Sequence, residues 1–224
     1  MVMSRWLNLR ETAKLIAFRY TGLGAPQYPY AVRPILLAYL INELERLKGI
    51  KGNIAEIGVA SGKTTRFLCE HIVTQDLGST LTYYALDTFS SFLKKDIEFE
   101  ITNRNKKQMK SLNAFAYNDF DIWKKNFNQF PFVKPIKADC AEFDYGEIAP
   151  LKLSFLDVDL YLPIRGALPK LYDATIVGGT IVVDEVLDNH LFDGAYQAYM
   201  EFCRDRNINP KIISNRYGVI SKTN

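Results

Sequence analysis

A stretch punctuated by two glycines, residues 53 to 63, constrains the fold of this chain more than any other. Its apolar run is broken only by Glu56 and predicts a buried strand, and Gly58 and Gly62 predict a tight turn into a helix that begins near Lys63. Glycine lets the backbone approach a bound molecule, and the N–H groups of a helix start face the same crevice. The stretch therefore predicts an α/β fold with a ligand at the carboxyl end of this strand.

Spacing separates three classes of cofactor site that use such a turn. Gly62, Lys63 and Thr64 imitate the end of a phosphate-binding loop. That loop needs four residues between its glycines, and here three separate Gly58 from Gly62. A dinucleotide fingerprint fails as well, because Ala60 and Lys63 stand where glycines would be required. The remaining pattern, Glu-x-Gly-x-x-x-Gly, is the one with which Rossmann-like methyltransferases hold the methionine end of S-adenosylmethionine.

Composition narrows the class of protein further. The 224 residues suffice for one domain with its own core, and 48% hydrophobic against 24% charged residues indicates a globular protein. We find no run of about 18 apolar residues that could cross a membrane and no secretory signal, so the expected location is the cytoplasm. The three cysteines are widely spaced, which suggests reduced thiols. A net charge of +3 without a dense basic cluster gives no indication of nucleic-acid binding.

The rest of the chain alternates predicted helices and strands within a single domain, 1–224. We expect strands at 81–86, 133–138, 151–160 and 180–183, helices at 4–20, 35–48, 65–73, 163–172 and 194–206, and a closing hairpin formed by 211–214 and 218–221. Between the first two helices lies a loop rich in Gly, Pro and Tyr, which either packs on the surface or forms a flap over a ligand through Tyr28 and Tyr30.

A long polar connection, residues 88–132, carries no predicted strand. Its length exceeds the usual crossover between strands, and such an excess is commonly a lid or a substrate-recognition element. The lysines and arginines in its first half could attract an acidic substrate, although an exposed helical face explains them as well.

Two further strand ends suit an adenosine cofactor. Asp87 closes the second strand, where an acidic side chain can accept hydrogen bonds from both ribose hydroxyls. The alternative is an ordinary solvated aspartate at a strand end. Asp139 and Cys140 follow the third strand, where residues can bracket an adenine ring, and a plain turn is equally compatible with them.

Carboxylates also close the fourth and fifth strands. Asp157 and Asp159 are two positions apart, so their side chains project to one side if the extended backbone persists. Asp184 and Glu185 follow the next strand. Neighbouring parallel strands bring these groups into one crevice, where like charges require protonation or a cation. Oxygen ligands without Cys or His favour magnesium, calcium or manganese over zinc. Capping of surface turns is the alternative explanation.

Together these patterns resemble the macrocin O-methyltransferase family, whose members methylate sugar hydroxyls on natural products, and more distantly catechol O-methyltransferase. The resemblance extends over roughly residues 35–205. It is carried by residues 56–62, 87–89, 126–127, 156–161, 171–172 and 178–185. It implies a Rossmann-like, doubly wound and mostly parallel seven-stranded sheet with a C-terminal antiparallel hairpin, and S-adenosyl-L-methionine as the cofactor.

The resemblance also implies a magnesium site. In that family the carboxylates that match Asp157, Asp184 and Glu185 bind Mg²⁺, which holds two neighbouring oxygens of the acceptor. This chain departs from the family at Val158, where glycine is more frequent, and at the acidic pair, which is more often Asp-Asp. Catechol enzymes place a catalytic lysine where Leu160 stands. The departures leave the metal ligands in place and leave the general base open.

We therefore expect an O-methyltransferase in which Mg²⁺ or Mn²⁺ activates a hydroxyl and Asp157 or Asp159 takes its proton. The residues expected to hold the cofactor are Glu56, Gly58, Ser61, Gly62, Thr64, Asp87, Thr88, Asp139, Cys140 and Asp157. Those expected to face the substrate are Tyr28, Tyr30, Tyr161 and His190.

Two other functions stay open at this point: an NTPase with a variant phosphate loop, and a non-catalytic methyltransferase-like module that only binds. The expected partner of the enzyme is a small-molecule acceptor, not a nucleic acid or a membrane, and self-association into a homo-oligomer is compatible with the sequence.

Overall fold

A computed structural model describes residues 33–111 and 114–223 together with residues 9, 12, 13 and 16. The chain forms two compact units, Met1–Val32 and Arg33–Asn224. The four described residues of the first unit are helical, as the helix predicted at 4–20 requires. The remainder of that helix and the loop that contains Tyr28 and Tyr30 lie outside the described residues.

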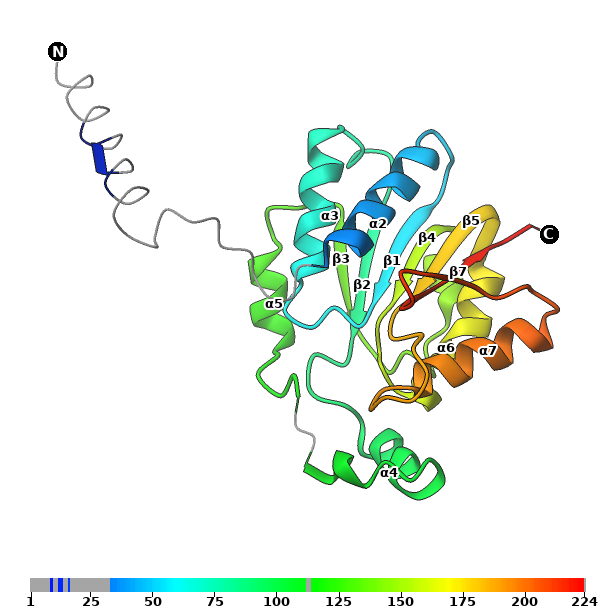
Figure 1. Cartoon of the computed structure of the whole chain (residues 1–224). Coiled ribbons are helices and arrows are strands. Elements are labelled where there is room, and N and C mark those ends of the chain that lie inside the picture. The colour runs from blue at the N-terminus through cyan, green and yellow to red at the C-terminus, as the bar shows by residue number, and fades with distance from the viewer. Residues whose placement is uncertain (1–8, 10–11, 14–15, 17–32, 112–113, 224) are drawn as a thin grey trace, which may run out of the picture. The chain divides into compact units, whose positions relative to one another are not determined.

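The second unit is built on a seven-stranded sheet (Figure 1). Its strands are β1 (Asn53–Ile57), β2 (Tyr83–Asp87), β3 (Val133–Lys137), β4 (Leu151–Leu156), β5 (Thr175–Val183), β6 (Lys211–Ile213) and β7 (Tyr217–Ser221). Their order across the sheet is β3-β2-β1-β4-β5-β7-β6. The first five are parallel and β7 runs antiparallel to both of its neighbours. The predicted doubly wound sheet with a C-terminal hairpin is thus confirmed.

Helices cover both faces of the sheet (Figure 1). Helices α2 (Pro34–Arg46), α3 (Lys63–Thr74) and α5 (Phe120–Asn126) share one hydrophobic core with the sheet. Helices α6 (Tyr161–Ala174) and α7 (Gly194–Asp205) and the short 3-10 helix η3 (Tyr145–Ile148) share the other. Because every crossover between parallel strands packs a helix on one face or the other, the strand ends stay free along one edge.

The connection between β2 and β3 contains no strand among its described residues, as expected. It holds helix α4 (Lys94–Asn103), the 3-10 helix η2 (Lys107–Ser111) and α5. Helix α4 lies beyond the carboxyl ends of the parallel strands (Figure 1). This position is the one a lid over a ligand site would take.

Two predicted strand boundaries were wrong. The strand expected at 151–160 ends at Leu156, and Asp159 adopts a left-handed backbone conformation with φ of 61°. The extended backbone that would align Asp157 with Asp159 therefore does not persist. The strand expected at 180–183 is longer than predicted, because β5 begins at Thr175. It passes through Gly178, which has a φ of 83° and lies where the pairing of β5 with β4 is irregular. In the described part of the chain no helix is both long and apolar enough to span a membrane.

Candidate active site

The glycine turn after β1 brings two strand ends into contact. Gly58 and Gly62 both have positive φ, 85° and 82°. A Cβ at Gly58 would overlap the carbonyl oxygen of Asp157, and a Cβ at Gly62 would overlap the ring of Phe127. The turn therefore needs glycine for close packing as well as for backbone conformation. Its contact with Asp157 places the predicted cofactor turn directly beside the predicted acceptor site.

Asp87 organises this turn. One carboxylate oxygen, Oδ2, accepts the backbone N–H groups of Val59 at 2.8 Å and Ala60 at 3.0 Å, and Oδ1 accepts that of Phe89 at 2.7 Å. Burial raises the pKa of Asp87, and these N–H donors act against the rise. The carboxylate thus holds the turn in shape before any ligand binds. Contact between Asp87 and a ribose remains a prediction.

Glu56 lies beneath the turn in the core. Its Oε2 accepts the hydroxyls of Thr65 at 2.6 Å and Tyr83 at 2.5 Å, and only 2% of the residue is exposed. Burial raises its pKa to about 8. The described contacts of Glu56 join β1 to α3 and β2, so its first role is to support the turn from below. Sequence reasoning missed Thr65 and Tyr83, since only the packing of α3 and β2 on β1 reveals them.

The remaining predicted cofactor residues line or adjoin the same edge. Ser61 is exposed on the turn, Thr64 is half-buried in the first turn of α3, and the hydroxyl of Thr88 donates to the carbonyl of Ser91 at 3.2 Å. No interaction of the described residues tests whether these three side chains contact a cofactor.

The insertion reaches both ends of the cofactor edge. The side-chain amide of Asn118 donates to the carbonyl of Ala60 at 2.9 Å, and Lys95 of α4 pairs with Asp139 at 2.5 Å. Asp139 also accepts the N–H of Ala141 at 3.0 Å. The Cys140 thiol points into the core, where burial raises its pKa, so only its backbone can face a ligand. The insertion is therefore fastened over the ends of β1 and β3.

On the acceptor side, the structure brings the three predicted metal ligands together and pairs them with two arginines. Nε of Arg216 donates to Oδ1 of Asp184 at 3.0 Å, and its Nη2 contacts Glu185. Arg33 forms an ion pair with Asp184, and its Nη1 lies 3.8 Å from Oδ2 of Asp157. Its Nη2 lies 3.9 Å from Oε1 of Glu185. Sequence reasoning missed both arginines.

These arginines come from distant parts of the chain. Arg33 is the residue just before α2, and Arg216 stands in the turn of the β6–β7 hairpin, where its carbonyl accepts the N–H of Val186 at 2.7 Å. In the present arrangement guanidinium groups supply the positive charge that the crevice needs. Among residues 33–111 and 114–223 no group of three or more His, Cys, Asp and Glu side chains is arranged to hold a metal ion.

The crevice still carries an excess of carboxylates. Desolvation raises the pKa of Asp157 to about 6, although the charge of Arg33 lowers it. Desolvation, together with the charge of Asp157, also raises the pKa of Asp159 well above its usual range. Carboxylate oxygens are the ligand type that a hard divalent cation takes, but in the present arrangement these described side chains pair with the arginines and are not grouped around a metal position.

Of the predicted substrate residues, His190 lies at the crevice and Tyr161 does not point to it. Nε2 of His190 is 3.6 Å from Oε2 of Glu185, and its Nδ1 accepts the N–H of Phe192 at 3.2 Å. The hydroxyl of Tyr161 instead donates to Glu201 at 2.8 Å, and its ring stacks on Phe99 of α4. Tyr161 thus supports the insertion, and its contacts give no support for a substrate role.

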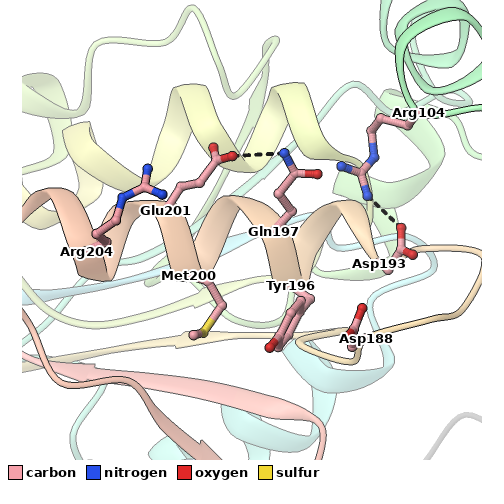
Figure 2. A pocket seen from close by; sticks show the side chains of 8 residues that line it. All are labelled: Arg104, Asp188, Asp193, Tyr196, Gln197, Met200, Glu201 and Arg204. Carbon is pink, nitrogen blue, oxygen red and sulfur yellow. Dashed lines mark hydrogen bonds and ion pairs between the residues drawn. The ribbon is translucent and has the colours of Figure 1, made fainter.

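An ion-pair network clamps α4 to the loop that carries His190. The N–H of Tyr161 donates to Glu100, Arg104 joins Glu100 to Asp193 at 2.6 Å, and Lys106 binds Asp193 at 2.7 Å and the carbonyl of His190 at 2.8 Å. Figure 2 shows Arg104 reaching Asp193 at the rim of a hollow of about 520 Å³ along α7. Asp157, Asp184 and Glu185 do not line this hollow, so it is not part of the carboxylate crevice.

A doubly wound sheet of this order, with a glycine turn after β1 and an acidic end to β2, defines a Rossmann-like methyltransferase. The model of the macrocin O-methyltransferase (TylF) family matches residues 36–219. The chain belongs to this family and is an S-adenosylmethionine-dependent O-methyltransferase.

Solved structures agree with this fold. The O-methyltransferase NovP superposes with a TM-score of 0.65 at 17% identity, over 92% of this chain and 88% of its own. The calicheamicin methyltransferase CalS11 gives 0.67 at 14%, over 94% and 90%. Cofactor-bound Rv0187 from MTB gives 0.56 at 13%, over 96% and 97%. No curated protein sequence matches the chain.

Proposed function

We propose that the enzyme transfers the methyl group of S-adenosylmethionine to a hydroxyl of a small molecule, either a sugar or another vicinal diol of a natural product. One observation carries the proposal: the carboxylates of Asp157, Asp184 and Glu185 gather at the strand ends directly beside the glycine turn. Methyl acceptor and methyl donor would therefore meet across the contact between Gly58 and Asp157. The similarity to NovP and to the calicheamicin enzyme supports a natural-product acceptor.

The transfer forms an oxygen–carbon bond as the sulfonium sulfur–carbon bond breaks, and the acceptor hydroxyl gives up its proton. The glycine turn and Asp87 position the donor, since alignment of the reacting atoms supplies much of the rate. Asp157 is the preferred proton acceptor because its backbone packs directly against the glycine turn, so its carboxylate would lie beside the acceptor hydroxyl. Asp159 is the second candidate. His190, whose Nε2 lies 3.6 Å from Glu185, would help to orient the acceptor.

We further propose that Asp157, Asp184 and Glu185 hold a divalent cation, Mg²⁺ or Mn²⁺, during turnover. When bound, such an ion lowers the pKa of a coordinated hydroxyl and fixes two neighbouring acceptor oxygens. The excess of carboxylates at the crevice and the family resemblance support this part of the proposal.

Thermal-shift measurements with three ligands test the proposal. S-adenosylhomocysteine should stabilise the full chain and ATP should not, because the glycine turn lacks the length of a phosphate loop. Stabilisation by ATP alone would favour the NTPase. Mg²⁺ together with a vicinal diol should add a further shift in the presence of S-adenosylhomocysteine. A chain that binds the cofactor product yet methylates no member of a panel of glycosides and diols would instead be a binding module.

A further inference from the structure

The Arg33 side chain joins the ends of two neighbouring strands. Its Nη1 contacts Asp184, which follows β5, and lies 3.8 Å from Oδ2 of Asp157, which follows β4. Its Nη2 lies 3.9 Å from Glu185. These are the same three carboxylates that the proposed function assigns to a divalent cation, so the guanidinium group and the cation would compete for one place.

We propose that Arg33 acts as a stand-in cation in the metal-free enzyme, and that Mg²⁺ or Mn²⁺ binds by displacing it while Arg216 stays as a fixed counter-charge. The inference rests on the metal part of the proposed function. It gives a role to Arg33 and Arg216, which belong to none of the sequence motifs discussed above.

Charge supports the exchange. Asp157, Asp184 and Glu185 carry three negative charges when ionised, and Arg216 neutralises one of them. The two that remain match one divalent cation. With Arg33 in place of that cation one negative charge is left, so a divalent cation matches the charge of the three carboxylates better than the guanidinium group does.

The two arginines are anchored differently: Arg216, which should stay, is held more firmly than Arg33, which should leave. Arg216 is held by its backbone, since its carbonyl accepts the N–H of Val186 at 2.7 Å, and its side chain engages Asp184 and Glu185 together. Arg33 reaches the crevice only through its side chain, 36% of which is exposed to solvent. Water can therefore take over its hydrogen bonds when it leaves, whereas removal of Arg216 would disturb the hairpin.

A Mn²⁺ titration of the full chain, saturated with S-adenosylhomocysteine, tests the exchange. Electron paramagnetic resonance measures the free Mn²⁺ at each step and so gives the affinity. R33Q should bind Mn²⁺ at least about tenfold more tightly than wild type, because no side chain has to be displaced. R216Q makes the same change of charge and should gain clearly less. R206Q is the matched control, since Arg206 pairs with Asp173 on the surface, and its affinity should equal that of wild type.

A second measurement uses the wild-type chain and does not depend on how the variants fold. The Nε–H resonance of Arg33, identified by its loss in R33Q, should move to the position of a free arginine when Mg²⁺ is added, and that of Arg216 should stay. An unmoved Arg33 resonance at saturating Mg²⁺, or equal gains in R33Q and R216Q, would overturn the inference.

Absence of Mn²⁺ binding in every variant would overturn the inference together with the metal part of the proposed function. The affinity for S-adenosylhomocysteine, measured on the same samples, reports separately on the cofactor assignment, which that outcome would leave standing.

Discussion

The site has a cofactor half, with the glycine turn, Glu56 and Asp87, and an acceptor half, with Asp157, Asp184 and Glu185. The carboxylates of the two halves find their hydrogen-bond and ion-pair partners in different ways. Glu56 and Asp87 accept hydrogen bonds from neutral hydroxyl and N–H donors that belong to the same β1–α3–β2 unit. Asp157, Asp184 and Glu185 are paired with guanidinium groups that come from the start of α2 and from the last hairpin. The cofactor half is thus complete in itself, and the acceptor half depends on charges brought from elsewhere.

The difference matters for function. Neutral donors on a strand and a helix keep one geometry, which suits a cofactor that every turnover uses in the same way. An arginine side chain is long and can exchange its partner for water, a metal ion or a substrate. We therefore expect the acceptor half to change its ion pairs during turnover while the cofactor half stays as it is. The predictions below test this separation, from the largest expected effect to the smallest.

The largest effect is expected from Asp184→Asn, which keeps the shape of the side chain and removes the charge that both arginines share. Methyl transfer should fall by about 100-fold or more, because the crevice loses a buried carboxylate that the proposed function assigns to the cation and that pairs with Arg216. The affinity for S-adenosylhomocysteine should stay within about twofold of wild type. Titration calorimetry and a methyl-transfer assay on the same preparation check both halves of the prediction.

Asp205→Asn on the exposed end of α7 is the control for loss of one charge and should leave both measurements unchanged. A parallel fall in cofactor affinity in Asp184→Asn would show that the two halves are coupled and would break the comparison.

A pair of glycine substitutions measures the rigidity of the cofactor half. Gly62 and Gly178 have almost the same φ, 82° and 83°, but a Cβ at Gly62 overlaps Phe127, whereas none of the described atoms lies within 4 Å of a Cβ at Gly178. Gly178→Ala should cost about 1–2 kcal/mol of unfolding free energy from backbone strain alone. Gly62→Ala should cost a further 1–3 kcal/mol, roughly, from overpacking.

Urea unfolding measures both costs, and the affinity for S-adenosylhomocysteine should fall only in Gly62→Ala. Equal costs in the two variants would mean that Phe127 yields readily, and that the turn is softer than the structure indicates.

Asp87→Ala removes the acceptor of three backbone N–H groups and, if the ribose binds there, of its hydroxyls as well. We expect the affinity for S-adenosylhomocysteine to fall by about 1–3 kcal/mol, since each lost bond to a charged acceptor has a cost of that order. Any binding of Mn²⁺ should be unaffected. Unchanged cofactor affinity in a folded variant would place Asp87 outside the ribose site and leave it only a structural role in the turn.

The same contrast explains what the sequence could and could not predict. The strand, the glycine turn and the acidic end of β2 depend on neighbours in the chain, so local pattern predicted them well. Arg33 and Arg216 reach the crevice through long-range packing that no local pattern records. The expected alignment of Asp159 with Asp157 failed because the strand ends at Leu156, four positions before the expected end at residue 160, and Asp159 itself has a positive φ.

Tyr161 shows a related limit of sequence reasoning. It is expected to face the substrate, but helix α6 begins at this residue and its ring stacks on Phe99, so its described contacts give that prediction no support. Adjacency in sequence to a functional residue predicts adjacency in space only while the backbone direction holds, and here it changes at Asp159.

The smallest predicted effect concerns Glu56 and asks whether this carboxyl group is neutral in the folded protein. Burial raises the pKa of Glu56 from 4.5 to about 8, so the folded protein keeps a proton that the unfolded chain releases above pH 4.5. Glu56 therefore contributes a stability that is lost as pH rises from 4.5 towards 8. Glu56→Gln cannot ionise, and its amide oxygen can still accept the hydroxyls of Thr65 and Tyr83.

Across that window the variant should gain stability relative to wild type, by at most about 1.4 kcal/mol per pH unit, while every other titrating group cancels in the difference. Urea unfolding of both proteins at matched pH values measures this slope. A difference that does not change with pH would mean that Glu56 is already ionised in the fold. The cofactor half would then hold a second carboxylate charge beside that of Asp87, and its contrast with the acceptor half would rest on the neutral character of the donors alone.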